Sequence, residues 1–161
     1  MARPSFKILV DNRQKTVRLS PRKTAGWAKK ILKALGWKRA ALSFVFVNDS
    51  EIRRYHRQYL GIDRPTDVLA FGQIERPFPP SKTPFLGDIV ISVETARREA
   101  PRYGHRWDEE LLLYVCHGIL HLMGYRDGTP PQKARMERKQ KEILRKVLGS
   151  PWQSKKPKRL F

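Results

Sequence analysis

The amino-acid sequence predicts an α/β (α+β-like) domain, in which a small mixed four-stranded sheet is covered by helices and one apolar helix lies at the centre. Three observations indicate this fold class. Short β-branched and aromatic runs alternate with helical patterns in the order strand, helix, strand, helix, strand, loop, strand and then three helices. The stretch before Gly124 is apolar nearly all round, which is typical of a buried helix. A length of 161 residues suits one domain and is short for two.

The chain begins with a predicted strand and helix. Residues 5–10 have a strand pattern, and residues 16–19 are expected to continue it. Ser20 and Pro21 then form an N-cap and first-turn signal for a helix that should end before Gly36. The apolar stripe of this helix consists of Ala28, Ile31, Leu32 and Leu35.

A second strand and helix are predicted next. Residues 41–47 are apolar, aromatic and β-branched, which indicates a strand buried on both faces. Asp49 or Ser50 is expected to cap the helix that follows, which runs to about Tyr59. That helix combines basic side chains with a ring that can stack on bases.

Two further strands are expected at residues 66–71 and 86–92, and a helix at residues 93–103. Between the two strands, residues 73–85 contain four prolines and therefore cannot form regular structure. This segment is expected to be a loop or flap that borders the functional site.

The C-terminal part predicts a last helix, which begins at Pro130 and ends at Gly149 and carries an apolar stripe within a basic surface. Residues 1–150 are therefore expected to form a single domain. Residues 151–161 lack a core pattern and are expected to be a flexible basic tail.

The candidate functional site lies in the central helix, within the sequence YVCHGILHLMGYRDG at residues 114–128. His117 and His121 are four residues apart, so their side chains lie one turn apart on the same helix face. Gly124 is expected to end the helix, which allows Asp127 to fold back towards both imidazoles. This pattern predicts a metal site with His117, His121 and Asp127 as ligands and water in an open fourth position.

Other interpretations of this helix exist. Each histidine could be a hydrogen-bonded core residue, with Gly124 an ordinary cap. The spacing also resembles the HExxH helix of metalloproteases, in which a glutamate after the first histidine is the general base. Here Gly118 takes that position, so the metal geometry is kept and the protease base is lost. Cys116 points about 100° away from His117, which favours a core role for it.

Three motifs, in order and spacing, resemble those of the YbeY family, metal-dependent endoribonucleases implicated in ribosomal RNA maturation and ribosome quality control. HGILHLMGYRD resembles the family signature HGxLHLxGYDH; RPTDVLAF at residues 64–71 resembles pTDVLSF; LGDIVIS at residues 86–92 resembles LGDIvIS. The resemblance covers about residues 41–128. It implies a YbeY-like metallohydrolase domain of about four strands with helices on both sides, and His117, His121 and Asp127 as its catalytic metal ligands.

The chain departs from the family pattern at two places. The third metal ligand of the family is a histidine ten residues after the first, where this chain has Asp127, and Arg126 stands at the adjacent family Asp position. The family also tends to carry an arginine in a YRG segment, where this chain has Leu60. Arg57 and Arg64 are the nearby candidates to replace that arginine.

The charge balance predicts the chemical class of the partner. Lys and Arg number 34 against 15 Asp and Glu, which gives a formal net charge of +19. This excess favours a polyanion, most commonly nucleic acid, over a surface selected only for solubility. Arg53, Arg57 and Arg64 are the expected RNA contacts.

The expected compartment is the cytoplasm. No stretch approaches the roughly 20 apolar residues of a membrane span. The single cysteine, Cys116, cannot form an internal disulfide, which fits a reducing environment.

The expected chemistry is metal-assisted cleavage of single-stranded RNA, with ribosomal RNA and the ribosome or its small subunit as partners. Zn²⁺, one per chain, is the first candidate, and the Asp127 carboxylate also suits Mn²⁺ or another hard divalent cation. The motif contains no general base, so Asp67, Asp88 and the substrate itself are candidates. Two alternatives are a non-catalytic ribosome- or RNA-binding assembly factor with a structural metal, and a metallopeptidase, which the missing glutamate disfavours.

Overall fold

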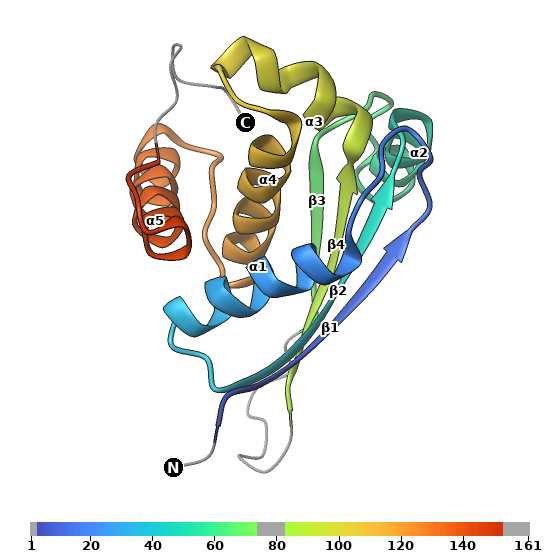
Figure 1. Cartoon of the computed structure of the whole chain (residues 1–161). Helices are drawn as coiled ribbons and strands as arrows, with labels where there is room; N and C mark the ends of the chain where they lie inside the picture. Colours follow the sequence, from blue (N-terminus) through green and yellow to red (C-terminus); the bar gives the residue numbers. More distant parts are fainter. Residues whose placement is uncertain (1–2, 74–82, 153–161) are drawn as a thin grey trace.

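The computed structural model describes residues 3–73 and 83–152 of the chain (Figure 1). The elements of these residues, in chain order, are β1 (Ser5–Asn12), α1 (Pro21–Ala34), β2 (Arg39–Val47), α2 (Asp49–Leu60), β3 (Val68–Gly72), β4 (Phe85–Ser92), α3 (Val93–Glu99), the 3-10 helix η1 (Ala100–Tyr103), α4 (Trp107–Leu122) and α5 (Pro130–Leu148). Among the described helices, none combines the length and the apolar composition that crossing a bilayer requires.

The four strands form one mixed sheet in the order β1-β2-β4-β3. β1 pairs in parallel with β2, and β2 pairs in parallel with β4. β3 lies antiparallel to β4 at the edge of the sheet. Parallel neighbours need crossover connections, and α1 provides the one between β1 and β2. The predicted mixed four-stranded sheet is therefore confirmed.

Helices cover both faces of this sheet (Figure 1). One face carries Phe44 and Phe46 of β2 and packs in the main core with α1, α4 and α5. The opposite face carries Val47 of β2, which packs in a second cluster with Ile52 of α2 and Val90 of β4. β2 is thus buried on both faces, as its apolar sequence predicts, and α2 lies across the sheet from α4.

α4 is the central helix, because it contacts α1, α3, α5, β3 and β4. Its middle approaches the sheet so closely that there is no room for a side chain at Gly118. A Cβ there would lie 2.6 Å from Ile89 Cγ2 and 3.3 Å from Val68 Cγ1. Gly118, at the position where the protease motif has glutamate, therefore lies at the contact between α4 and the sheet.

The sequence-based expectation for the continuation of the first strand is wrong. Residues 16–19 do not continue the first strand, whereas Asp11 and Asn12 belong to β1. The physical reason lies in Gln14, whose side-chain amide donates to Val17 O at 3.0 Å and accepts from Val17 N at 3.0 Å. Because these bonds occupy both backbone groups of Val17, the residue has none left for a strand partner.

The expected caps and helix ends also differ in detail. Asn48 occupies the N-cap position of α2 without a capping hydrogen bond from its side chain, while Asp49 is the first residue of the helix and directs its carboxylate towards Ser92, Thr95 and Arg98. The helix expected at residues 93–103 tightens into the 3-10 helix η1, which has a proline in its first turn. Most of the expected flap (residues 74–82) and of the expected tail (residues 153–161) lie outside the described residues.

Candidate metal centre

The end of α4 brings the candidate ligands together. The helix ends at Leu122 with Met123 as its C-cap, and Gly124 follows with φ +96°, a left-handed conformation that reverses the chain. The amide of Tyr125 donates to Leu120 O at 3.1 Å, which fixes this turn. The next residues run back along the helix, so that Asp127 faces the histidines as expected from the sequence.

We call His117, His121 and Asp127 the metal centre. The candidate ligand atoms of these three side chains all lie within 4.8 Å of one another. The two Nε2 atoms are 2.9 Å apart, and Asp127 Oδ2 lies 3.5 Å from each of them. The side chain of His117 is 5% exposed, whereas those of His121 and Asp127 are 28% and 27% exposed. The centre is therefore buried on one side and open to solvent on the other.

The outer nitrogens of both imidazoles are held by oxygen acceptors. His117 Nδ1 lies 3.1 Å from the side-chain oxygen of Gln140, and His121 Nδ1 lies 2.9 Å from the carbonyl of Tyr125. Because these oxygens only accept, they favour the tautomer of each neutral imidazole in which Nδ1 carries the proton and Nε2 offers its lone pair to a metal. Two lone pairs and a carboxylate thus converge on one point, an arrangement that a cation satisfies.

The protonation states also suit metal binding. Burial lowers the pKa of His121, and the repulsion that would arise if both imidazoles were protonated lowers it further, so the His121 imidazole is neutral at pH 7. Hydrogen bonding with His117 holds the pKa of Asp127 below its ordinary value, although burial acts in the opposite direction. A neutral imidazole and an ionised carboxylate are the forms that bind metal.

Gln140 of α5 was not identified from the sequence. It is 7% exposed and lies in the buried face of α5, together with Met136, Ile143 and Leu144. A single amide within an otherwise apolar stripe is the signal that could have indicated it, because a buried polar side chain needs a partner. Its position lets α5 orient a ligand that α4 supplies.

The candidate general bases are held elsewhere. Asp67 accepts a hydrogen bond from the amide of Val68 at 2.8 Å, at the start of β3. Asp88 of β4 accepts from Ser43 and, at 2.6 Å, from Gln73. Neither carboxylate belongs to the group of residues that could hold a metal among the described residues.

Two of the three expected RNA contacts are likewise not brought to the metal centre. Arg53 and Arg57 lie on α2, across the sheet from α4, and both pair with Asp63, at 2.8 and 3.9 Å. The carbonyl of Arg64 lies 2.8 Å from His56 Nδ1, which anchors the segment after α2 and explains why His56 is buried.

A basic hollow, which we call the Tyr125 hollow, lies beside the metal centre. It measures about 380 Å³ and is lined by Met123, Gly124, Tyr125, Arg126, Gln132 and Arg135. The Arg135 guanidinium lies 5.5 Å from the centre of the Tyr125 ring. Neither Arg126 nor Arg135 has a carboxylate partner within residues 3–73 and 83–152. Two uncompensated cations therefore lie next to the turn that carries Asp127.

Cys116 precedes the first ligand in sequence but takes no part in the metal centre. It is fully buried in the main core, and this burial raises the pKa of its thiol. It is therefore a packing residue, as the helical geometry predicts.

Comparisons with known proteins identify relatives of this chain. Residues 9–148 match the family model described as "Endoribonuclease YbeY". The chain is 35% identical over 151 residues to the Endoribonuclease YbeY of Syntrophus aciditrophicus, covering 92% of this chain and 94% of the relative. It is 41% identical over 142 residues to the protein of the same name from Geobacter sulfurreducens, covering 86% and 94%. The solution structure of a Thermotoga maritima protein is similar with a TM-score of 0.60 and 26% identity, over 89% of each chain.

Proposed function

The chain belongs to the YbeY endoribonuclease family, and on this premise we propose that it cleaves single-stranded RNA at a divalent metal ion held by His117, His121 and Asp127. The observation that carries the proposal is the convergence of the two Nε2 lone pairs and the Asp127 carboxylate on one point. Zn²⁺ is the proposed ion, since two imidazoles, one carboxylate and an open position are typical of catalytic zinc.

The bound ion supplies Lewis acidity for the phosphodiester and for a water molecule. The protein's own groups do the positioning. Gln140 and the Tyr125 carbonyl fix the tautomers and orientations of His117 and His121. Asp127 would hold the ion with a negative charge, which would make the ion a weaker Lewis acid than a third neutral histidine would.

Basic side chains around the centre provide the contacts to RNA phosphates. Arg126 and Arg135 in the Tyr125 hollow, which have no carboxylate partner among the described residues, would stabilise charge that develops on the phosphate. Arg53, Arg57 and Arg64 remain proposed contacts for more distant parts of the strand. The net charge of +19 supports a polyanionic substrate, and we propose that this is ribosomal RNA, presented by the small subunit in the cytoplasm.

The peptidase alternative requires a general base after His117. A side chain at Gly118 would collide with Ile89 of the sheet, so this position cannot supply one. The alternative of a non-catalytic RNA-binding factor differs from the nuclease only in turnover, which the following experiment measures.

The experiment combines elemental analysis of the purified protein with incubation on single-stranded RNA, with and without a chelator. We expect bound metal, and cleavage that is lost on chelation and in His121→Ala. Asp127→His should keep or tighten metal binding. His56→Gln is the matched control, because it removes an imidazole outside the metal centre and leaves an amide that can donate to Arg64 O. Full metal retention by His121→Ala would refute the site, and bound metal without cleavage would favour the binding factor.

A further inference from the structure

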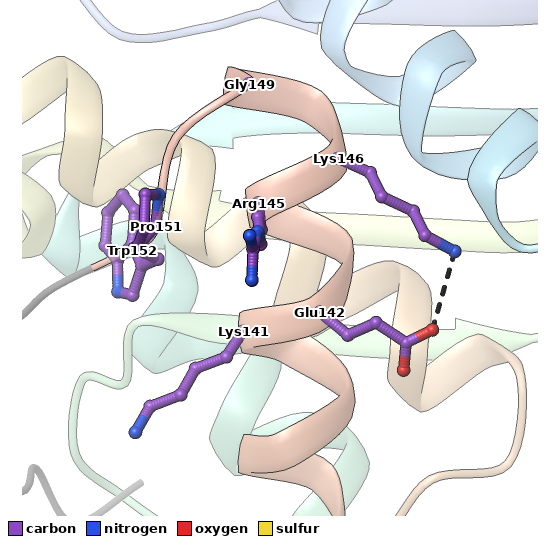
Figure 2. Close-up of a pocket in the computed structure, with 7 residues that line it drawn as sticks. All are labelled: Lys141, Glu142, Arg145, Lys146, Gly149, Pro151 and Trp152. Atoms are coloured by element: carbon purple, nitrogen blue, oxygen red, sulfur yellow. Dashed lines mark ion pairs between the residues drawn. The ribbon is translucent and has the colours of Figure 1, made fainter.

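A second hollow, which we call the C-terminal hollow, lies at the end of α5 (Figure 2). It measures about 660 Å³, within the range of ligand-binding pockets. The residues that line it are Lys141, Glu142, Arg145, Lys146, Gly149, Pro151 and Trp152. It thus combines several charged side chains with one large aromatic ring.

The Trp152 ring is held in place by a second ring. Gly149, with φ +73°, ends α5 in a left-handed conformation, and the chain then brings Trp152 against His105. The two ring centres are 4.6 Å apart. His105 is itself fixed, since its Nδ1 lies 3.1 Å from the carboxylate of Glu110, which is fully buried. The indole is therefore a positioned wall of the hollow and packs against the main core.

The cations of the hollow are not all neutralised. Lys146 pairs with Glu142 at 3.5 Å. Lys141 and Arg145, by contrast, have no carboxylate partner in the part of the chain that the structure describes. They lie four residues apart and therefore on one helix face. In Figure 2, Lys141 extends on the side where Trp152 lies, whereas Lys146 and Glu142 extend on the other side.

We propose that the C-terminal hollow binds one nucleotide of a single-stranded RNA, with the base stacked on Trp152 and the phosphate held by Lys141 and Arg145. The inference rests on the proposed function, because it takes RNA as the ligand. An aromatic ring beside cations is the combination by which proteins hold single strands without choosing a sequence. A free phosphate would interact with the cations but not with the ring, and an apolar ligand would interact with the ring but not with the cations. A nucleotide interacts with both.

The Trp152 end of the hollow, where the base would stack, is remote from the reaction. Trp152 rests on His105, just before the first turn of α4, whereas His121 lies at the other end of that helix. At 1.5 Å per residue, the two ends are roughly 20 Å apart. A strand must therefore extend over several nucleotides to reach both places, and the hollow should govern binding of the strand and not the rate of cleavage.

The test measures binding to the intact, metal-loaded protein by fluorescence anisotropy. The probe is a labelled single-stranded DNA of about 12 nucleotides, which offers bases and phosphates but is not a ribonuclease substrate. The variants are Trp152→Ala, Trp152→Phe and the double variant Lys141→Ala with Arg145→Ala. The matched control is Lys29→Ala with Lys33→Ala, which removes an exposed pair of cations at the same spacing on α1, where neither lines the hollow.

Trp152→Ala should raise Kd about tenfold, while Trp152→Phe, which keeps a stacking ring, should retain most of the affinity. The Lys141/Arg145 double variant should reduce the slope of log K against log salt by about 1.4, which is about 0.7 for each cation that no longer neutralises a phosphate. On cleavable RNA the same variants should raise KM and leave kcat unchanged.

Wild-type affinity and salt dependence in Trp152→Ala and in the Lys141/Arg145 variant would overturn the inference. An equal loss in the Lys29/Lys33 control would do so too, because the attraction would then come only from net charge. Both of these outcomes can be distinguished from a failure of the proposed function, because in that case the wild-type protein would not cleave RNA at all.

Discussion

Replacing Gln140 by leucine tests how far a residue outside the metal centre controls it. Gln140 and His117 are 7% and 4% exposed, so the 3.1 Å hydrogen bond between them is shielded from water. Its loss leaves the Nδ1 hydrogen of His117 without a partner, at a cost of about 1–3 kcal/mol. Without metal, the proton can move to Nε2 and bond to Asp127, which leaves Nδ1 as an unpartnered acceptor but partly relieves that cost. With metal bound it cannot, because Nε2 is then a ligand.

The cost should therefore appear in metal affinity. We expect Gln140→Leu to bind Zn²⁺ about 10–100-fold more weakly, equivalent to about 1.4–2.7 kcal/mol, and to change the unfolding free energy of the metal-free protein by less than about 1 kcal/mol. Gln140→Glu keeps an acceptor for His117 and should retain wild-type affinity.

The assay is a competition for Zn²⁺ with a chromogenic chelator, together with urea denaturation of the metal-free protein. Wild-type Zn²⁺ affinity in Gln140→Leu would refute the reasoning. An equal loss of stability with and without metal would also refute it, because Gln140 would then act only by packing.

Gly118→Ala places a methyl carbon 2.6 Å from Ile89 Cγ2 and should destabilise the protein by about 1–3 kcal/mol, measured by urea denaturation. Asp49→Asn should lower stability at pH 7. Burial acts to raise the pKa of Asp49, but hydrogen bonds, including one from Arg98, outweigh it and hold this pKa below 3.8. The Asp49 contribution is thus present above pH 3.8 and lost as the pH falls further, so the difference from Asp49→Asn should shrink there in pH-dependent denaturation. Zn²⁺ at 100 times its Kd should add about 2.7 kcal/mol, which raises Tm by about 5–11 °C in calorimetry, and should have no such effect on His121→Ala.

Each of these three expectations can fail clearly. A stable Gly118→Ala protein would mean that α4 can move away from the sheet. A stability difference for Asp49→Asn that persists at about pH 2 would mean that its charge is not the source. A Zn²⁺-induced rise in Tm that survives His121→Ala would place the ion elsewhere.

The metal centre was predictable from the sequence because its geometry is local. Helical periodicity puts His117 and His121 on one face. Gly124 reverses the chain after the helix, so that Asp127, three residues later, lies beside the two imidazoles. The alternation of apolar runs and turn signals likewise predicted the strands, since burial on both faces of β2 requires a continuously apolar sequence.

What was not predictable depends on packing between distant segments. Gln140 is 23 residues from His117, and only the contact between α4 and α5 brings the two together. The pairing of Arg53 with Asp63 depends on the conformation of the segment after α2. The error at residues 16–19 has a similar origin, because a side chain of Gln14, and not a neighbouring strand, takes the backbone groups of Val17.

The burial of Cys116 has a consequence for the ion that the protein acquires. A thiolate beside His117 would have given the centre a soft donor and a preference for thiophilic ions. With the only sulfhydryl of the chain sealed in the core, the first coordination sphere offers nitrogen and oxygen alone. The affinity of such a donor set for divalent transition metals follows their general order, and its ligand types discriminate little between these ions. Occupancy in a cell is then decided by which of these ions is in supply.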